Sequence, residues 1–365
     1  MPDDLLYQVA LTWVPNIGAV QAKILIDHFE TAENIFKAKV KQLESIEGIG
    51  EVKAQSIKNF DDFSGAEEEI NFIEKFKIET LFITDPAYPQ RLKACYDAPT
   101  LLYYRGNANL NHPKIVSIIG TRNNTDYGRH LTEQLVADLQ SMNVLVASGL
   151  AYGVDALAHK AAIQNNLPTV GVLAHGLDKI YPPQHTGLAK QMLLNGGLLT
   201  EFRKDTLPDK HNFPRRNRIV AGMADCTIVI ETALKGGSMI TAELANGYNR
   251  DVFAFPGKTT DLKSAGCNHL VKNNKAFILT DAHQLIEQMG WASKKMKPKP
   301  QKELFISLTP EEEILVNILK QKETIHIDEL FLKSGLNSSI VAATMLGLEF
   351  GNIVSSLPGK MYKLL

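Results

Sequence analysis

The sequence is poor in the residues that mark disulfide-stabilised and metal-binding proteins. Its 365 residues include three cysteines, Cys95, Cys226 and Cys267, which lie far apart and form no CxxC pair. Their odd number argues against a disulfide framework, and the ten histidines show no spacing typical of metal ligands. We therefore expect no metal, no other cofactor and a reducing environment.

Long apolar segments are absent as well. The first residues, MPDDLLYQVA, lack the basic region and apolar stretch of a signal peptide, and no run of about 18 apolar residues occurs in the chain. The sequence thus predicts neither export nor a membrane partner. Cytoplasmic localisation is the default expectation.

An excess of positive charge is also missing, because 39 lysines and arginines are balanced by 40 aspartates and glutamates. Any surface that binds nucleic acid must therefore be local. Hydrophobic residues make up 44% of the sequence, which is enough to build a buried core. Because a single core rarely grows beyond roughly 250 to 300 residues, the length predicts two or three domains.

A short internal repeat occupies the N-terminal region, which we assign to residues 1–78. The segments PNIGAVQAKIL (Pro15–Leu25) and EGIGEVKAQSI (Glu47–Ile57) align with their Ile-Gly pairs in register. An Ile-Gly turn that leads directly into a helix is typical of helix-hairpin-helix (SAM-like) domains. Such hairpins resemble motifs that hold a DNA phosphate at a helix N-terminus. Neither hairpin carries a strong basic cluster, so a role in packing or partner contact is an equal alternative.

From residue 79 to 291, short apolar runs alternate with segments of helical periodicity. This alternation predicts an α/β domain with a Rossmann-like, doubly wound parallel sheet and helices on both faces. The predicted strands are Leu81–Thr84, Lys114–Ile119, Val144–Ala147, Thr169–Ala174, Gly197–Thr200, Thr227–Glu231 and Val252–Phe255, and the predicted helices include Tyr127–Met142, Asp155–Asn165 and Met239–Asn249.

The C-terminal part begins with a lysine- and proline-rich linker at residues 292–303. Residues 304–365 then predict a winged helix, with helices at Thr309–Lys322, His326–Gly335 and Leu336–Phe350 before two short strands. The third helix has no lysine or arginine, and the whole segment carries five cations against seven acids. Because strong DNA binding requires phosphate neutralisation, we expect a protein contact or a weak accessory role, although winged helices often read duplex DNA.

Polar and glycine-rich segments follow several of the predicted strands. In open α/β sheets, ligands bind at the carboxyl ends of the strands, where glycine lets the backbone approach a phosphate. The segments are SIIGTR, SGLAYGVD, HNFPRRNRIVAG and LKGGSMITAE. The candidate nucleic-acid-binding residues in them are Gly120, Arg122, Ser148, Gly149, Lys210, Phe213, Arg215, Arg216, Asn217, Arg218, Gly237 and Ser238.

Local positive charge is highest between Glu201 and Val220, where six cations face three acids. Phe213 lies between Lys210 and Arg215 in this segment. An aromatic ring among cations is how proteins hold unpaired strands, because the ring stacks on a base while the cations follow the phosphates. A solvated surface loop is the alternative interpretation.

The motifs GTR, SGLAYGVDALAH, GLDKIYPPQH, TEF, FPRRNRIVAG, GGSMITAELA and FPG, in this order, resemble the DprA/Smf (DNA-processing protein A) family. With the hairpins and the winged helix, the resemblance covers essentially the whole chain. It implies a non-enzymatic protein that binds incoming single-stranded DNA without sequence preference. It also implies a homodimer formed through the Rossmann-like domain and loading of RecA in natural transformation and recombination. By matching position, Arg122 and Lys210 would contact phosphates and Phe213 would stack on a base, while some of the neighbouring arginines would instead fix the loop to the sheet.

Enzymatic alternatives have weaker support. The GKT in FPGKTT lacks the earlier glycine of a P-loop, because Val252 occupies that position. Asp155 and His159 lie one helical turn apart, but no nucleophile accompanies them. The main rival is a nucleoside-monophosphate phosphoribohydrolase of the LOG group, whose PGGxGTxxE loop resembles the segment from Lys235 to Glu243 only in part.

Overall fold

The computed structural model describes residues 4–292 and 308–365. These residues divide into two compact units, one that ends at Ile278 and one that begins at Leu279, and each unit is described by itself. Apart from Ala292, the predicted linker lies outside the described residues.

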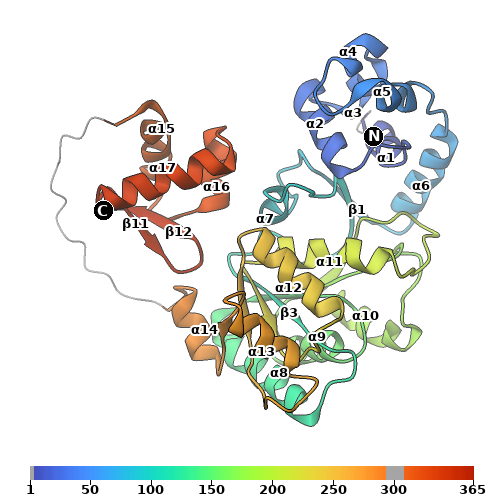
Figure 1. The fold of residues 1–365 in the computed structure, drawn as a ribbon. Helices are drawn as coiled ribbons and strands as arrows, with labels where there is room; N and C mark the ends of the chain where they lie inside the picture. The colour runs from blue at the N-terminus through green and yellow to red at the C-terminus, as the bar shows by residue number, and fades with distance from the viewer. Residues whose placement is uncertain (1–3, 293–307) are drawn as a thin grey trace. The chain divides into compact units, whose positions relative to one another are not determined.

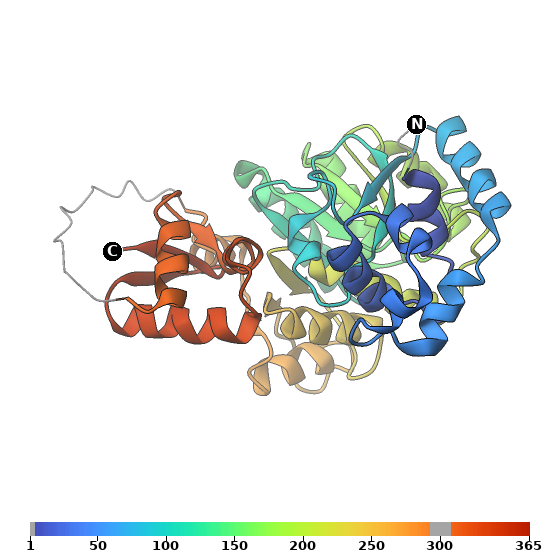
Figure 2. The ribbon, with the colours of Figure 1, turned by 90° about the horizontal axis from the view of Figure 1, so that it is seen from above.

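Six helices form the N-terminal part of the first unit, and Figure 2 shows them in blue against the sheet domain. The predicted repeat forms two helices, one that begins just after Gly18 and one that begins at Gly50. Gly50 has a φ of +59° and Gly48 a φ of +84°, a region that glycine enters at low cost. The helices are α1 (Leu5–Leu11), α2 (Ala19–Phe29), α3 (Ala32–Lys37), α4 (Val40–Glu44), α5 (Gly50–Lys58) and α6 (Phe63–Lys75).

A nine-stranded sheet forms the centre of the first unit, in the order β1-β2-β6-β5-β4-β3-β7-β8-β9. The strands from β6 to β9 in this order pair in parallel, which confirms the doubly wound core. The sheet is nevertheless mixed, because β2 pairs antiparallel with both β1 and β6. The strands are β1 (Glu79–Phe82), β2 (Leu101–Gly106), β3 (Ile115–Ile119), β4 (Leu145–Ser148), β5 (Thr169–Val172), β6 (Gly196–Thr200), β7 (Cys226–Val229), β8 (Asp251–Ala254) and β9 (Phe277–Ile278).

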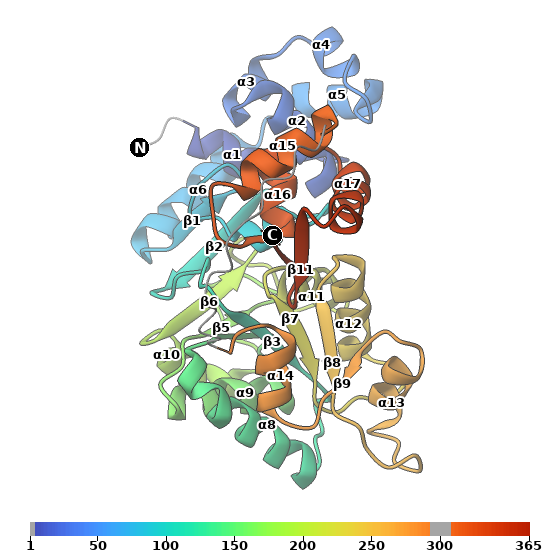
Figure 3. The ribbon, with the colours of Figure 1, turned by 90° about the vertical axis from the view of Figure 1, so that its left-hand side faces the viewer.

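Helices cover both faces of this sheet, as predicted. Figure 3 shows α8 (Asp126–Asp138), α9 (Val154–Gln164) and α10 (Thr186–Met192) on one side of the strands. It shows α11 (Asn212–Gly222), α12 (Gly237–Gly247) and α13 (Ala265–Lys272) on the other. Right-handed crossovers require this division, because the strand order runs one way from β3 to β6 and the other way from β7 to β9. The order therefore reverses beside β3. The remaining helix, α7, spans Gln90–Lys93.

The second unit contains the predicted winged helix. Its helices α15 (Pro310–Leu319), α16 (Ile327–Ser334) and α17 (Ser338–Phe350) surround a core that includes Leu315, Leu330 and Met345. A three-stranded sheet, β10-β12-β11, completes it. Its strands are β10 (Ile325–His326), β11 (Val354–Leu357) and β12 (Met361–Leu364), and α14 (Ala282–Gln288) also belongs to this unit. Over both described stretches, no helix is long and apolar enough to cross a membrane.

Candidate nucleic-acid interface

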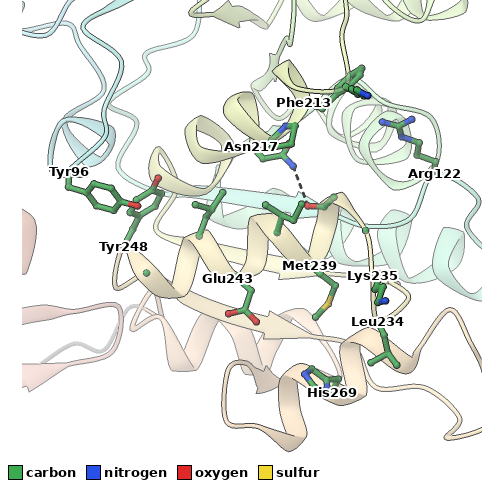
Figure 4. Close-up of a pocket in the computed structure, with 17 residues that line it drawn as sticks. Tyr96, Arg122, Phe213, Asn217, Leu234, Lys235, Met239, Glu243, Tyr248 and His269 are labelled. Carbon is green, nitrogen blue, oxygen red and sulfur yellow. Dashed lines mark hydrogen bonds between the residues drawn. The ribbon is translucent and has the colours of Figure 1, made fainter. Parts of the chain in front are cut away.

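The three principal candidate residues lie together where the strand order reverses. Arg122 follows β3 and Phe213 is the second residue of α11, and the guanidinium carbon of Arg122 lies 5.3 Å from the centre of the Phe213 ring. Both residues, together with Lys210, line a groove of about 1060 Å³ along α12 (Figure 4). The sequence placed them in segments about 90 residues apart, and the reversal in strand order brings them to one surface.

Two tyrosines extend this cluster and were not among the predicted site residues. The ring of Tyr181 lies 6.3 Å from that of Phe213, and Tyr152 donates a hydrogen bond to the side-chain oxygen of Gln184. Both tyrosines are 45% exposed and line a small cavity of about 60 Å³ that also contacts Arg122. Both tyrosines could have been found from the sequence, because Tyr152 belongs to the motif SGLAYGVD and Tyr181 to GLDKIYPPQH.

The arginines of α11 separate into exposed and buried positions. Arg215 has a side chain that is 60% exposed, and its guanidinium lies 3.5 Å from Glu201. Arg216 is buried and donates to the carbonyl oxygen of Val172, while Arg218 is buried and donates to Glu201 and to the carbonyl oxygen of Asp97. The sequence named all three as candidates and expected some of them to fix the loop to the sheet instead; Arg216 and Arg218 are the two whose buried side chains fix α11 to the sheet.

Asn217 also has a partner inside the domain. It is 8% exposed, and its side-chain nitrogen donates to the carbonyl oxygen of Gly237 at 3.2 Å (Figure 4). This bond joins α11 to the first turn of α12. Asn217 also lines the groove, so its contact with DNA stays a prediction.

The acids beside the buried arginines are held in the interior. Burial raises the pKa of Asp155, although Arg216 and the backbone N–H of Ala151 favour its charged form. Burial likewise raises the pKa of Glu201 despite its contacts with Arg218 and Arg215. These pairs neutralise charge inside the domain, which leaves Arg122, Lys210 and Arg215 as the predicted cations that remain exposed.

Three predicted residues lie at the strand ends. The Ser148 hydroxyl is fully buried and donates to the carbonyl oxygen of Ile118 at 2.6 Å. A side chain at Gly149 would collide with Arg216 and Asp155, and one at Gly120 would collide with Val154. Ser148 and Gly149 are buried and therefore serve packing, whereas Gly120 is only partly buried and its contact with DNA stays a prediction.

Gly237 and Ser238 lie at the start of α12. Gly237 is exposed and lines the groove, and Gly236 before it makes no side-chain cap for the helix. The Ser238 hydroxyl lies 2.6 Å from that of Thr232. An uncapped helix start leaves backbone N–H groups that can bind an anion such as a phosphate.

The candidates for catalysis have structural partners. The ring of His159 is buried between the Thr169 hydroxyl and the carbonyl oxygen of Gly149, each at 2.6 Å, and burial lowers its pKa to about 4. Glu243, on the wall of the groove, pairs with Lys275 at 2.8 Å. Within residues 4–292 and 308–365, no group of three or more histidine, cysteine or acidic residues is arranged to hold a metal ion.

Family models match three parts of the chain. Residues 79–290 match the model of the DNA recombination-mediator protein A family. Residues 9–69 match a helix-hairpin-helix motif, and residues 297–360 match the DprA winged helix domain.

Individual relatives agree with these matches. The chain is 32% identical to Protein Smf of Synechocystis, with 98% of both chains covered. The X-ray structure of DNA processing protein A from Streptococcus pneumoniae matches with a TM-score of 0.67 and 30% identity, covering 77% of this chain and 96% of that one. DNA processing protein A from Helicobacter pylori, described for its single-stranded DNA binding mode, matches with a TM-score of 0.53 and 32% identity, over 58% and 94% of the two chains.

Proposed function

The chain belongs to the DNA recombination-mediator protein A family, and from that premise we propose that it binds single-stranded DNA without sequence preference at the groove lined by Arg122, Lys210 and Phe213. The stacking of the Arg122 guanidinium beside the Phe213 ring carries this proposal. A ring beside a cation offers one surface to a base and one charge to the adjacent phosphate, whatever the base.

The remaining candidates fit this path in different ways. Lys210 and Arg215 are exposed cations on either side of Phe213, suited to phosphates along the strand. Gly237 and Ser238 at the start of α12 offer backbone N–H groups. Arg216 and Arg218 support the path from within, and we assign them no contact with DNA.

Salt-dependent binding of oligothymidine tests the proposal. Arg122→Ala and Lys210→Ala should each weaken binding and reduce the slope of log affinity against log salt by up to about 0.7, the value for one phosphate of a single strand. Phe213→Ala should cost roughly 1 to 3 kcal/mol with little change in slope, because stacking releases no counterions.

Matched controls are available on the same chain. Arg129→Ala removes an exposed arginine of α8 that does not line the groove, and Phe350→Ala removes an exposed phenylalanine of α17. Both should bind like the wild type. Slopes for Arg122→Ala and Lys210→Ala that equal the wild-type slope would remove these residues from the phosphate path.

We further propose that the protein forms a homodimer through the sheet domain and protects the strand until it loads RecA, in the cytoplasm, during natural transformation or recombination. Membership of a recombination-mediator family supports this role. Sedimentation of the wild-type chain tests the dimer. The rate at which RecA hydrolyses ATP on DNA coated with single-strand-binding protein tests the delivery, and this rate should rise when the chain is added.

We propose that the protein acts by binding and not by catalysis. The Lys235–Glu243 segment matches the phosphoribohydrolase loop only in part, since Met239 and Ile240 replace its Gly-Thr pair. Incubation with nucleoside monophosphates should release no base. Turnover that disappears in Glu243→Ala would contradict the binding-only view.

A further inference from the structure

A buried carboxylate joins the N-terminal helices to the sheet domain. Glu69, on α6, is 1% exposed, and its two carboxylate oxygens accept hydrogen bonds from the backbone N–H of Lys204 at 3.0 and 3.2 Å. Removing a carboxylate from water is costly unless hydrogen bonds compensate for the lost hydration. Burial raises the pKa of Glu69, which reflects this cost. The usual surface role of an acid, to keep the protein soluble, therefore does not account for Glu69.

Lys204 belongs to the connecting loop, which we define as residues 201–211, between the end of β6 and the start of α11. In Figure 1 this yellow-green loop passes beside the end of α6. The loop makes a second contact with the N-terminal helices, because the guanidinium of Arg203 lies 4.4 Å from the ring centre of Trp13. Two consecutive loop residues are thus held by the helical domain, one through its backbone and one through its side chain.

The same loop leads directly to the proposed DNA contacts. Lys210 lies in its last turn, and Phe213 follows on α11. Between Lys204 and Lys210 the loop is tied to the sheet domain through the N–H of Asp205, which donates to Asp178 at 3.1 Å, and the N–H of Gly176, which donates to Thr206 at 3.3 Å. Glu69 and these two bonds are thus adjacent anchors of the loop, and loss of the first would leave the segment that leads to Lys210 and Phe213 held less firmly.

We propose that Glu69 is a positioning residue for single-stranded DNA: through the backbone of Lys204 it fixes the connecting loop, so that Lys210 and Phe213 are already oriented when the strand arrives. The inference rests on the proposed function. Glu69 itself touches no DNA. The helical domain thereby contributes to affinity without a contact of its own, because less conformational freedom remains to be lost on binding.

Affinity measured in two backgrounds tests this role. In the otherwise wild-type chain, Glu69→Ala should weaken binding of oligothymidine about tenfold, the effect expected when one or two interface side chains must be ordered during binding. In a chain that already carries Lys210→Ala and Phe213→Ala, the same substitution should have almost no effect, since the side chains that it positions are absent. Glu69→Gln keeps one carbonyl acceptor for Lys204 and should restore most of the affinity.

The neighbouring acid provides the matched control. Glu68 is 72% exposed at its side chain and lies 3.4 Å from the Lys204 ammonium group, a surface ion pair of small energetic value. Glu68→Ala should leave affinity unchanged. Hydrogen exchange of the Lys204 amide gives a readout independent of DNA, and this amide should be protected in the wild type and exchange faster in Glu69→Ala.

Each outcome of these measurements either supports or contradicts the positioning role of Glu69. Full affinity in Glu69→Ala despite fast exchange at Lys204, or an equal loss in both backgrounds, would overturn the positioning role alone. If Glu69→Ala unfolds, Trp13→Leu removes the other contact with the loop and should show the same dependence on background. A wild-type chain that binds no oligothymidine would overturn the proposed function and this inference with it.

Discussion

Tyr181 offers a second ring beside Phe213, and its effect on binding is predictable. Tyr181→Ala should weaken oligothymidine binding by roughly 1 kcal/mol, the lower end of the range for base stacking, without changing the salt slope. Tyr181→Phe should bind like the wild type, because the ring and not the hydroxyl makes the contact. Tyr127→Ala, which removes a tyrosine that is 52% exposed and lines neither cavity, is the control. Fluorescence anisotropy at several salt concentrations gives both quantities, and a loss in Tyr181→Phe equal to that in Tyr181→Ala would exclude stacking.

His159 should make stability depend on pH. Burial lowers its pKa from the ordinary 6.5 to about 4, so between these values the unfolded chain binds a proton that the folded chain excludes. The contribution of His159 to stability is therefore present above the unfolded pKa and is lost as the pH falls towards the folded pKa. Between pH 7 and pH 5 the loss should be about 2 kcal/mol.

Urea unfolding of the wild type, His159→Gln and His130→Gln at these two pH values measures this effect. His130 is exposed on α8, so its variant should keep the wild-type pH dependence. His159→Gln should be less stable at pH 7 but should lose less on acidification. An unchanged pH dependence in His159→Gln would show that other groups cause the acid sensitivity.

Helix α11 carries two arginines, three residues apart, with opposite expected effects. Arg218→Ala leaves the buried Glu201 without its nearest cation and should destabilise the fold by about 3 to 5 kcal/mol, while the salt slope of the remaining folded protein stays near the wild-type value. Arg215→Ala removes an exposed cation and should cost at most about 1 kcal/mol of stability but reduce the salt slope. Thermal unfolding and DNA titrations on the same samples separate the two. A normal stability in Arg218→Ala would contradict the internal role.

The sequence could identify the FPRRNR segment but not the orientation of each of its side chains. Arg216, Asn217 and Arg218 are consecutive and all buried, so α11 shows no simple alternation between a polar and an apolar face. Their burial depends on partners far away in the chain, Val172 and Asp97 among them, which no local pattern reveals. The exposed position of Arg122 was predictable because it lies just beyond the end of β3, whereas Phe213 was singled out by its place between two cations and is partly buried on α11.

Strands were predicted where apolar runs alternate with helices. This rule explains which strands of the sheet were predicted and why β2 was missed. Strands β3 to β8 each lie within a short βα unit, and all six were predicted to within about two residues at each end, the usual precision of such boundaries. Two strands of the sheet were omitted, the two-residue β9 and β2, and β2 has no helix after it and pairs antiparallel with β6 through residues nearly 100 positions later. A rule based on βαβ units does not predict β2, although the Leu-Leu-Tyr-Tyr run of β2 favours a strand.

The order of the parts along the chain was predictable because each has its own periodicity and composition, and the three family models follow the same order. The way in which the helical and sheet domains are joined was not predictable. Contacts such as that of Glu69 with Lys204 depend on tertiary packing across 135 residues of sequence. An acid at a helical position in the sequence predicts a solvated surface, whereas the structure places this one inside an interface.

The winged helix should contribute little to DNA binding, although its fold is often used for that purpose. Helix α17 has no lysine or arginine, and its exposed residues include Ile340, Leu346 and Phe350. A chain that ends at Glu303, and so keeps the lysine-rich linker, should therefore bind oligothymidine with the salt slope of the full chain, to within the value for one phosphate, about 0.7. The full chain should bind a duplex more weakly than a single strand of equal length, because α17 cannot neutralise the phosphates on either side of a major groove. A shortened chain with a markedly lower slope, or a full chain that prefers the duplex, would assign to this domain a DNA contact that its charge does not support.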